Sequence, residues 1–204
     1  MDIGLDQLNS LLLEMADTSE KAVASAMEAY KRGGKATDVK GQADHLHMLH
    51  RQVSDLSMEI IARYQPVASD LRLVKACFEI SYGFFRFGRY AMDIAEVLEM
   101  FGDLSKCDHS EVVEIAEKTQ EMIRMSITAF ARRDVALARK IPELDNFVDE
   151  RYRKHIREVM GQKENLACSL SATLILRYLE RIADHATYIA ESVDYIVTGL
   201  EPPG

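Results

Sequence analysis

The stretch Arg177-Tyr-Leu-Glu-Arg-Ile-Ala-Asp-His-Ala-Thr-Tyr-Ile-Ala-Glu191 combines a helical pattern with two acids on one flank of that helix. Glu180 and Asp184 stand one turn apart, beside a line of apolar residues spaced alternately four and three, which is the period of a helix with one buried face. The line consists of Ile175, Leu179, Ile182, Ala186, Ile189, Val193 and Ile196. Like charges at this spacing repel, so a cation between the two carboxylates would stabilise the pair.

An earlier copy of the apolar line lies 95 residues toward the N-terminus (175 − 95 = 80). It consists of Ile80, Phe84, Phe87, Ala91, Ile94 and Leu98. The chain is therefore an internal repeat, and we predict two units of about equal length, residues 1–104 and residues 105–204.

The composition predicts an all-α protein, because 48% of the residues are hydrophobic, only four are proline, and alternating β-branched runs are almost absent. Each repeat should form a bundle of three long antiparallel helices joined mostly by short connections. The expected helices span about residues 5–31, 37–64, 69–101, 110–132, 134–160 and 165–198. We expect a turn at 161–164 and a tail at 201–204.

The net charge of −8 argues against nucleic-acid binding, which needs a concentrated basic face. No apolar run approaches the ~18 residues of a membrane span, and the N-terminus lacks the basic region of a signal peptide. We therefore expect a cytoplasmic protein that meets a membrane only through a partner. Cys77, Cys107 and Cys168 are odd in number and widely separated, so we expect reduced thiols.

A second acid pair, Asp145 and Asp149, has the same spacing of four on the preceding helix. Because a short turn joins these two helices, they should pack antiparallel and bring both acid pairs together. The four candidate ligands are Asp145, Asp149, Glu180 and Asp184. Four carboxylates suit a hard or borderline cation, with iron, manganese, magnesium and calcium as alternatives.

The first repeat lacks all four acids. Shifted by 95 residues, the same positions hold His50, Ser54, Phe85 and Arg89. We therefore predict one metal site, in the second repeat only. The alternative is that both acid pairs form a solvated helix face. No Glu-x-x-His pair typical of di-iron bundles occurs, which weighs against oxidase chemistry.

Catalytic signatures are absent from the sequence: it has no Gly-rich phosphate loop, nucleophile elbow or zinc motif. We therefore expect a protein that is not an enzyme. The aromatic cluster at residues 82–90 is interpreted as core together with a contact surface, which is compatible with a homodimer or with a partner protein.

Three motifs give the chain a family likeness: Gln65-Pro-Val-Ala-Ser-Asp-Leu-Arg72, Arg86-x-Gly88, and Leu179-Glu-Arg-Ile-Ala-Asp-His-Ala186. With them the chain resembles the PhoU family over nearly its whole length. The resemblance implies two three-helix bundles in a cytoplasmic accessory protein of the high-affinity phosphate ABC transporter. It also implies metal clusters, often of iron, bound by Glu/Asp-x-x-x-Asp motifs. Here those motifs fall on Asp145-x-x-x-Asp149 and Glu180-x-x-x-Asp184.

The function expected from this resemblance is regulation of phosphate uptake. The chain would dock on the nucleotide-binding subunit of the transporter, or on a linked sensor kinase, and restrain transport or signalling when phosphate is plentiful. Because the first repeat departs from the family's acid pattern, an adaptor for another ion transporter stays open as an alternative. Two further alternatives are a carboxylate-bridged metal store or oxidase that uses the same four acids, and a structural adaptor without metal.

Overall fold

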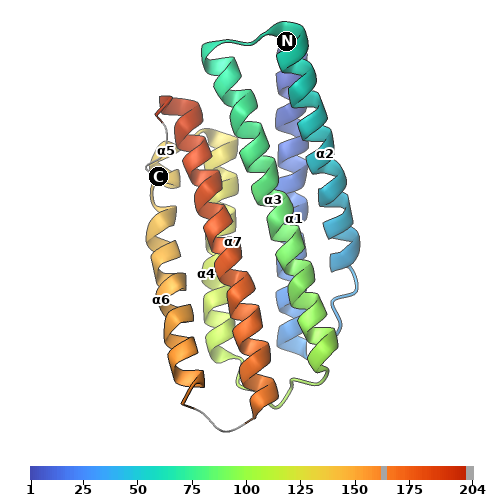
Figure 1. Cartoon of the computed structure of the whole chain (residues 1–204), viewed down its shortest axis with the longest axis vertical. Helices are drawn as coiled ribbons and strands as arrows, with labels where there is room; N and C mark the ends of the chain where they lie inside the picture. Colours follow the sequence, from blue (N-terminus) through green and yellow to red (C-terminus); the bar gives the residue numbers. More distant parts are fainter. Residues whose placement is uncertain (162–164, 201–204) are drawn as a thin grey trace.

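The fold is a bundle of long helices, seen in a computed structural model that describes residues 1–161 and 165–200 (Figure 1). Within these residues every regular element is helical, which confirms the all-α prediction. The elements are α1 (Asp2–Arg32), α2 (Val39–Tyr64), α3 (Ala68–Phe101), α4 (Ser110–Arg132), α5 (Val135–Ala138), α6 (Ile141–Val159) and α7 (Leu166–Thr198).

Two three-helix units make up this bundle, as predicted. Helices α1, α2 and α3 pack on one another, and α4, α6 and α7 form the second unit. The units meet mainly through α3 and α7, which run antiparallel at the centre of the molecule, while α6 lies at its outer edge (Figure 1). The predicted boundary between residues 104 and 105 falls in the link between α3 and α4.

The apolar lines of the repeat form the buried faces of these two central helices. In α7 every residue of the line from Ile175 to Val193 is buried, and Ile196 is half-buried. In α3 the copy from Ile80 to Leu98 is buried throughout. Fully burying an aliphatic or aromatic side chain stabilises a fold by about 1.5–3 kcal/mol, so the two lines form a large part of the core around the central helices.

Two glycines inside α3 mark close approaches to neighbouring helices. A Cβ atom at Gly83 would lie 2.7 Å from Cγ1 of Ile189 on α7, and one at Gly88 would collide with Leu46 on α2. A glycine within a helix costs up to about 1 kcal/mol relative to alanine. Here that cost is offset because the missing side chain lets α3 pack closely against both neighbours.

Several helix ends differ from the sequence-based expectation. Helix α1 begins at Asp2, three residues early, and α3 begins at Ala68, one residue before the expected start at 69. The expected fifth helix is divided into α5 and α6, with Pro142 in the first turn of α6, where a proline is tolerated. Of the expected turn and tail, residues 162–164 and 201–204 lie outside the described residues.

The expectation of three reduced thiols is wrong for two of them. Cys107 and Cys168 form a disulfide with their Cα atoms 5.5 Å apart, whereas Cys77 is free and buried. The two partners are 61 residues apart in sequence, and the fold brings the α3–α4 link to the first turn of α7. Cysteine spacing carries no signal for such a long-range meeting.

The helices of residues 1–161 and 165–200 include none that is both long and apolar enough to cross a membrane.

Candidate metal centre

Helices α6 and α7 bring three of the four predicted acids to one place. Asp149 on α6 and Glu180 and Asp184 on α7 each offer a carboxylate oxygen, and these oxygens lie within 4.8 Å of one another. All three side chains are partly or largely buried. Helices α6 and α7 thus pack so that their acids meet, as expected from the short connection between them.

The fourth acid, Asp145, lies one turn before Asp149 on α6 and interacts electrostatically with the other three carboxylates. Burial, together with the negative charges of Asp184, Asp149 and Glu180, raises the pKa of its carboxyl to about 6. Asp145 thus belongs to the cluster electrostatically, although it is not among the three acids whose oxygens converge.

Two buried carboxyl oxygens in the cluster have no hydrogen-bond partner among the described residues. They are Oδ1 of Asp145 and Oε2 of Glu180, the latter 3.8 Å from Nε of Arg181, which is beyond hydrogen-bond distance; Glu180 as a whole is only 9% exposed. An unsatisfied buried polar atom costs about 1–3 kcal/mol, and more when it is charged. Such atoms at a functional site point to a group that completes them, and a cation does so for carboxylates.

Three arginines partly neutralise the cluster from its rim. Nη1 of Arg177 donates to Glu180 at 2.6 Å, and Nη1 of Arg181 donates to Asp184 at 3.1 Å. Nη2 of Arg153 donates to Asp149 at 2.7 Å. Each arginine lies three or four residues from its acid on the same helix, so these pairs could have been predicted from the sequence spacing.

Burial has the largest effect on the pKa values of the two acids on α7, Glu180 and Asp184. It raises the pKa of both Glu180 and Asp184, and the repulsion among the carboxylates adds to that effect. Arg177 and Arg181 oppose it without reversing the direction. The cluster therefore holds more negative charge than its arginines stabilise, which is the electrostatic condition for cation binding.

The corresponding positions of the first repeat form a different arrangement. The ring of His50 stacks on Phe85 with 5.5 Å between centroids, and its Nδ1 lies 3.0 Å from the Ser81 hydroxyl. Ser54 donates to the His50 carbonyl, and Arg89 pairs with Asp93 at 2.9 Å. Burial lowers the pKa of His50. Aromatic packing and local hydrogen bonds thus occupy the place of the acid cluster.

An aromatic face continues from this region toward α7. His185, next to the acid cluster, lies between the rings of Tyr82, Tyr90 and Tyr188. Burial lowers the pKa of His185 to about 4, and the nearby guanidinium of Arg86 acts in the same direction. His185 is therefore neutral at physiological pH and contributes to packing.

The acid cluster fits a hard or borderline cation by its chemistry. Its ligands are carboxylates only, which suit iron, manganese, magnesium or calcium better than softer metals. In the part of the chain that the structure describes, no other group of three such side chains converges in this way. The identification of Asp145, Asp149, Glu180 and Asp184 as metal ligands stays a prediction.

Comparison with known proteins gives a consistent result over the whole chain. The family model described as "PhoU domain" matches twice, at residues 12–98 and 112–193. Proteins of Pseudomonas putida and Pseudomonas aeruginosa, both named phosphate-specific transport system accessory protein PhoU homolog, are 32% and 33% identical to it. Each alignment covers 97% of this chain, and 80% and 85% of the respective relative.

Two solved structures share the fold. The crystal structure of PhoU from Pseudomonas aeruginosa superposes with a TM-score of 0.91 at 31% sequence identity, covering 98% of this chain and 99% of that one. The phosphate transport system regulatory protein PhoU from Streptococcus pneumoniae gives a TM-score of 0.79 at 20% identity, over 100% of this chain and 99% of that one. At that identity the second match supports the fold alone.

Proposed function

The chain belongs to the PhoU family, and on that premise we propose that it is an accessory regulator of phosphate transport that docks on the cytoplasmic side of a phosphate ABC transporter. The observation that carries this proposal is the match, over 97% of the chain, to relatives named as accessory proteins of phosphate-specific transport. The nucleotide-binding subunit, or a linked sensor kinase, is the proposed partner. Docking restrains transport or signalling when phosphate is plentiful.

The acid cluster of the second repeat is the proposed cation site of this regulator. Asp149, Glu180 and Asp184 supply converging oxygens, and Asp145 adds charge beside them. A bound cation would supply a local positive charge that offsets the repulsion among the carboxylates. The guanidiniums of Arg153, Arg177 and Arg181 remain at the rim, where they can pair with acidic or phosphate groups of a partner.

Helices α3 and α7, one from each repeat, contribute a contact surface beside the proposed cation site. Tyr82 and Tyr188 are 43% and 53% exposed, and both contact the ring of His185. Exposed aromatic side chains are enriched at protein interfaces, because they bury a large area at low entropic cost. This face lies on the helices that also carry the acid cluster and its counterpart, so one partner could contact both.

Co-purification tests the proposal. Tagged protein should capture transporter subunits from cells grown with plentiful phosphate, and Glu180→Gln/Asp184→Asn should weaken the capture. Asp55→Asn/Glu59→Gln is the matched control, because Asp55 and Glu59 are also acids four residues apart but lie exposed on α2. Failure to capture any transporter or sensor subunit under both phosphate-rich and phosphate-poor growth would refute the docking proposal.

A further inference from the structure

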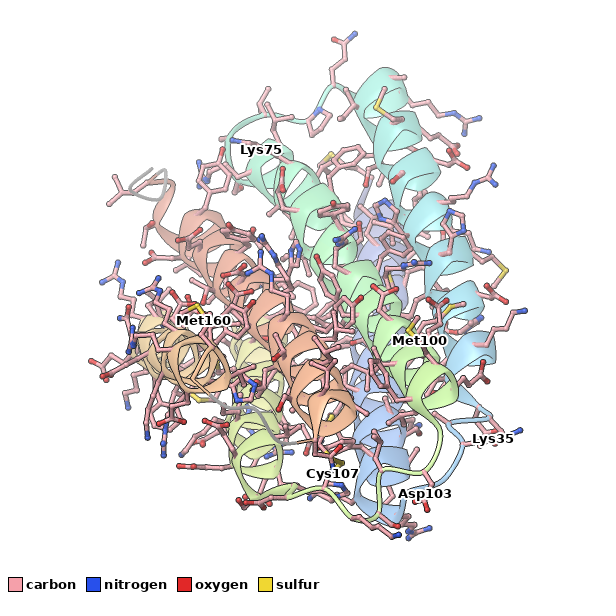
Figure 2. The ribbon with its side chains drawn as sticks, turned by 60° about the horizontal axis from the view of Figure 1, so that its bottom comes forward. Lys35, Lys75, Met100, Asp103, Cys107 and Met160 are labelled. Carbon is pink, nitrogen blue, oxygen red and sulfur yellow. A yellow bond between two sulfur atoms is a disulfide. The ribbon has the colours of Figure 1, made fainter. Side chains whose placement is uncertain are left out.

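The disulfide between Cys107 and Cys168 joins two segments at one end of the molecule. Cys107, labelled in Figure 2, lies in the link between α3 and α4. Cys168 lies in the first turn of α7. Both cysteines are partly exposed. Cys168 also lines a surface cavity of about 190 Å³, together with Glu111, His155 and Ser169. The bond is therefore accessible to a small thiol reagent.

Non-covalent contacts hold the same segments without the disulfide. In the link, Leu104 is buried, and the ring of His109 lies 4.5 Å from that of Tyr30 on α1. His109 Nε2 is also 2.9 Å from the Leu104 carbonyl oxygen. These contacts anchor the link to the first repeat, so opening the disulfide does not require the link to leave its place.

The start of α7 has its own anchors as well. His155 on α6 is only 7% exposed, and its Nδ1 lies 2.6 Å from Oε2 of Glu111 on α4. Its Nε2 lies 3.1 Å from the Thr173 hydroxyl on α7. One histidine thus connects the three helices of the second unit near the disulfide. Both ends of the bond are held by contacts that reduction leaves intact.

The third cysteine provides an internal contrast. Cys77 is 0% exposed, and burial raises the pKa of its thiol to about 12. Because the thiolate is the reactive form, Cys77 is excluded from thiol chemistry in the folded protein. The chain therefore has two accessible cysteines placed to react with each other and one that cannot take part.

We propose that Cys107 and Cys168 form a reversible thiol–disulfide exchange site, reduced by a dithiol and re-formed by a small-molecule disulfide. In reduction, a thiolate of the dithiol attacks one sulfur and forms a mixed disulfide, and the other cysteine leaves and takes up a proton. The second thiol of the reagent then displaces the remaining cysteine. Overall the protein gains two electrons and two protons, and the dithiol becomes a disulfide.

A cytoplasmic location, which rests on the proposed function, would make this exchange site a sensor of the cellular redox state. Cytoplasmic disulfides are usually transient and redox-sensing, because cellular thiols keep most cysteines reduced. The bond would then form under oxidising conditions and fix the link between the two repeats to the start of α7. The chemistry itself can be tested on the purified chain, so it does not depend on docking to a transporter.

The test uses the full-length chain purified without reductant, dithiothreitol as the dithiol, and iodoacetamide labelling read by peptide mass spectrometry. Before reduction, none of the three cysteines should be labelled. After reduction under native conditions, Cys107 and Cys168 should be labelled and Cys77 should stay unlabelled. Oxidised glutathione should restore protection of the pair. The circular dichroism spectrum should not change, because the link and the start of α7 keep their other contacts.

Three outcomes would overturn the proposal: labelling of Cys107 and Cys168 before reduction, reduction only after unfolding, or failure of oxidised glutathione to re-form the bond. Cys77→Ser is the matched control and should retain the full cycle. Cys168→Ser should leave Cys107 labelled throughout. If that variant does not fold, the labelling of the wild-type chain before and after reduction still tests the proposal. Transporter capture in either redox state has no bearing on these outcomes, so failure of docking and failure of the exchange site are distinguishable.

Discussion

The two repeats share a helical frame and differ in what they place on it. In the second repeat, Glu180 and Asp184 on α7 face Asp149 on α6 and form a charged cluster with unsatisfied buried oxygens. In the first, Phe85 on α3 stacks on His50 of α2, and the polar groups there are paired locally. The apolar lines that build α3 and α7 are buried in both units. The frame and the chemistry of the site are therefore encoded by different residues of the same helices.

The arginines show the same division. Arg181 and its counterpart 95 residues earlier, Arg86, occupy the same position in the two repeats (181 − 95 = 86). Arg181 donates to the carboxylate of Asp184, whereas Arg86 lies over the ring of Tyr90, 4.5 Å from its centroid. One cation at one helical position thus serves an acid cluster in the second repeat and an aromatic face in the first.

Removing the acids of α7 should have the largest effect, because it should abolish the metal binding that distinguishes the second repeat from the first. After loading with iron or manganese, the wild-type chain should hold one metal site, and Glu180→Gln/Asp184→Asn should lose it, with an affinity at least 100-fold lower. The reason is the loss of two of the three converging ligands. Elemental analysis after chelator-free purification measures the content. Arg89→Gln, in the first repeat, is the control and should bind like wild type. Equal metal in both proteins would dismiss the site.

Installing acids in the first repeat should abolish the difference between the units. The variant His50→Asp/Ser54→Asp/Phe85→Glu/Arg89→Asp places carboxylates at all four corresponding positions, so bound metal should double. Because it removes the His50–Phe85 stack, we expect the metal-free variant to lose about 2–4 kcal/mol of stability. Metal titration and chemical denaturation measure the two effects. A folded variant that still binds a single equivalent would show that ligand identity alone does not make the site.

Reducing the disulfide should lower the stability of the second unit more than that of the first. The two cysteines are 61 residues apart in sequence. For a loop of that length, the loss of unfolded-chain entropy stabilises the folded state by about 4 kcal/mol. We expect a loss of about 2–4 kcal/mol in the free energy of unfolding, measured by urea denaturation with and without dithiothreitol. Cys107→Ser/Cys168→Ser should reproduce the reduced value and be insensitive to the reagent. An unchanged midpoint on reduction would contradict this expectation.

Neutralising Asp145 should have a smaller effect with a defined pH dependence. The folded protein binds the Asp145 proton more tightly than the unfolded chain does, since the pKa is raised from 3.8 to about 6. The ionised cluster therefore lowers stability as pH rises through about 6. In metal-free protein, Asp145→Asn should gain about 1–2 kcal/mol at pH 8, after allowance for solvent screening, and much less at pH 4.

Thermal unfolding at several pH values measures the effect of Asp145→Asn. Asp17→Asn, at an exposed position on α1, is the control and should shift stability little at any pH. A gain that is the same at pH 4 and pH 8 would assign the effect of Asp145→Asn to packing rather than charge.

The sequence predicts most of the fold because helix periodicity and the repeat are local signals. The line from Ile175 to Val193 and its copy in α3 define the two central helices, and the bounds of α4 agree with the expected 110–132. The pairing of α6 with α7 follows from a short connection. This made it reasonable to expect Asp149 and Glu180 to meet, and the structure brings them together.

Other features could not be read from the sequence because they depend on long-range packing. Glu111, in the first turn of α4, pairs with His155, which is 44 residues away. His109 takes the capping position without a side-chain cap bond, and Asp108 accepts instead from the Ser110 amide. The meeting of Cys107 with Cys168 likewise needs the link to reach α7. Local spacing carries no information about such contacts.

Helix α6 is held to the molecule by few buried side chains. Only Ile141, Val148 and His155 are buried along it, and it lies at the outer edge of the bundle (Figure 1). Sparse burial places a helix among the segments that open first in local unfolding. Two of the four proposed ligands lie on α6, so cation binding and attachment of α6 are thermodynamically linked. A cation at 100 times its Kd would favour the attached state by about 2.7 kcal/mol. The metal supply of the cell would then set how often the outer edge of the second repeat opens.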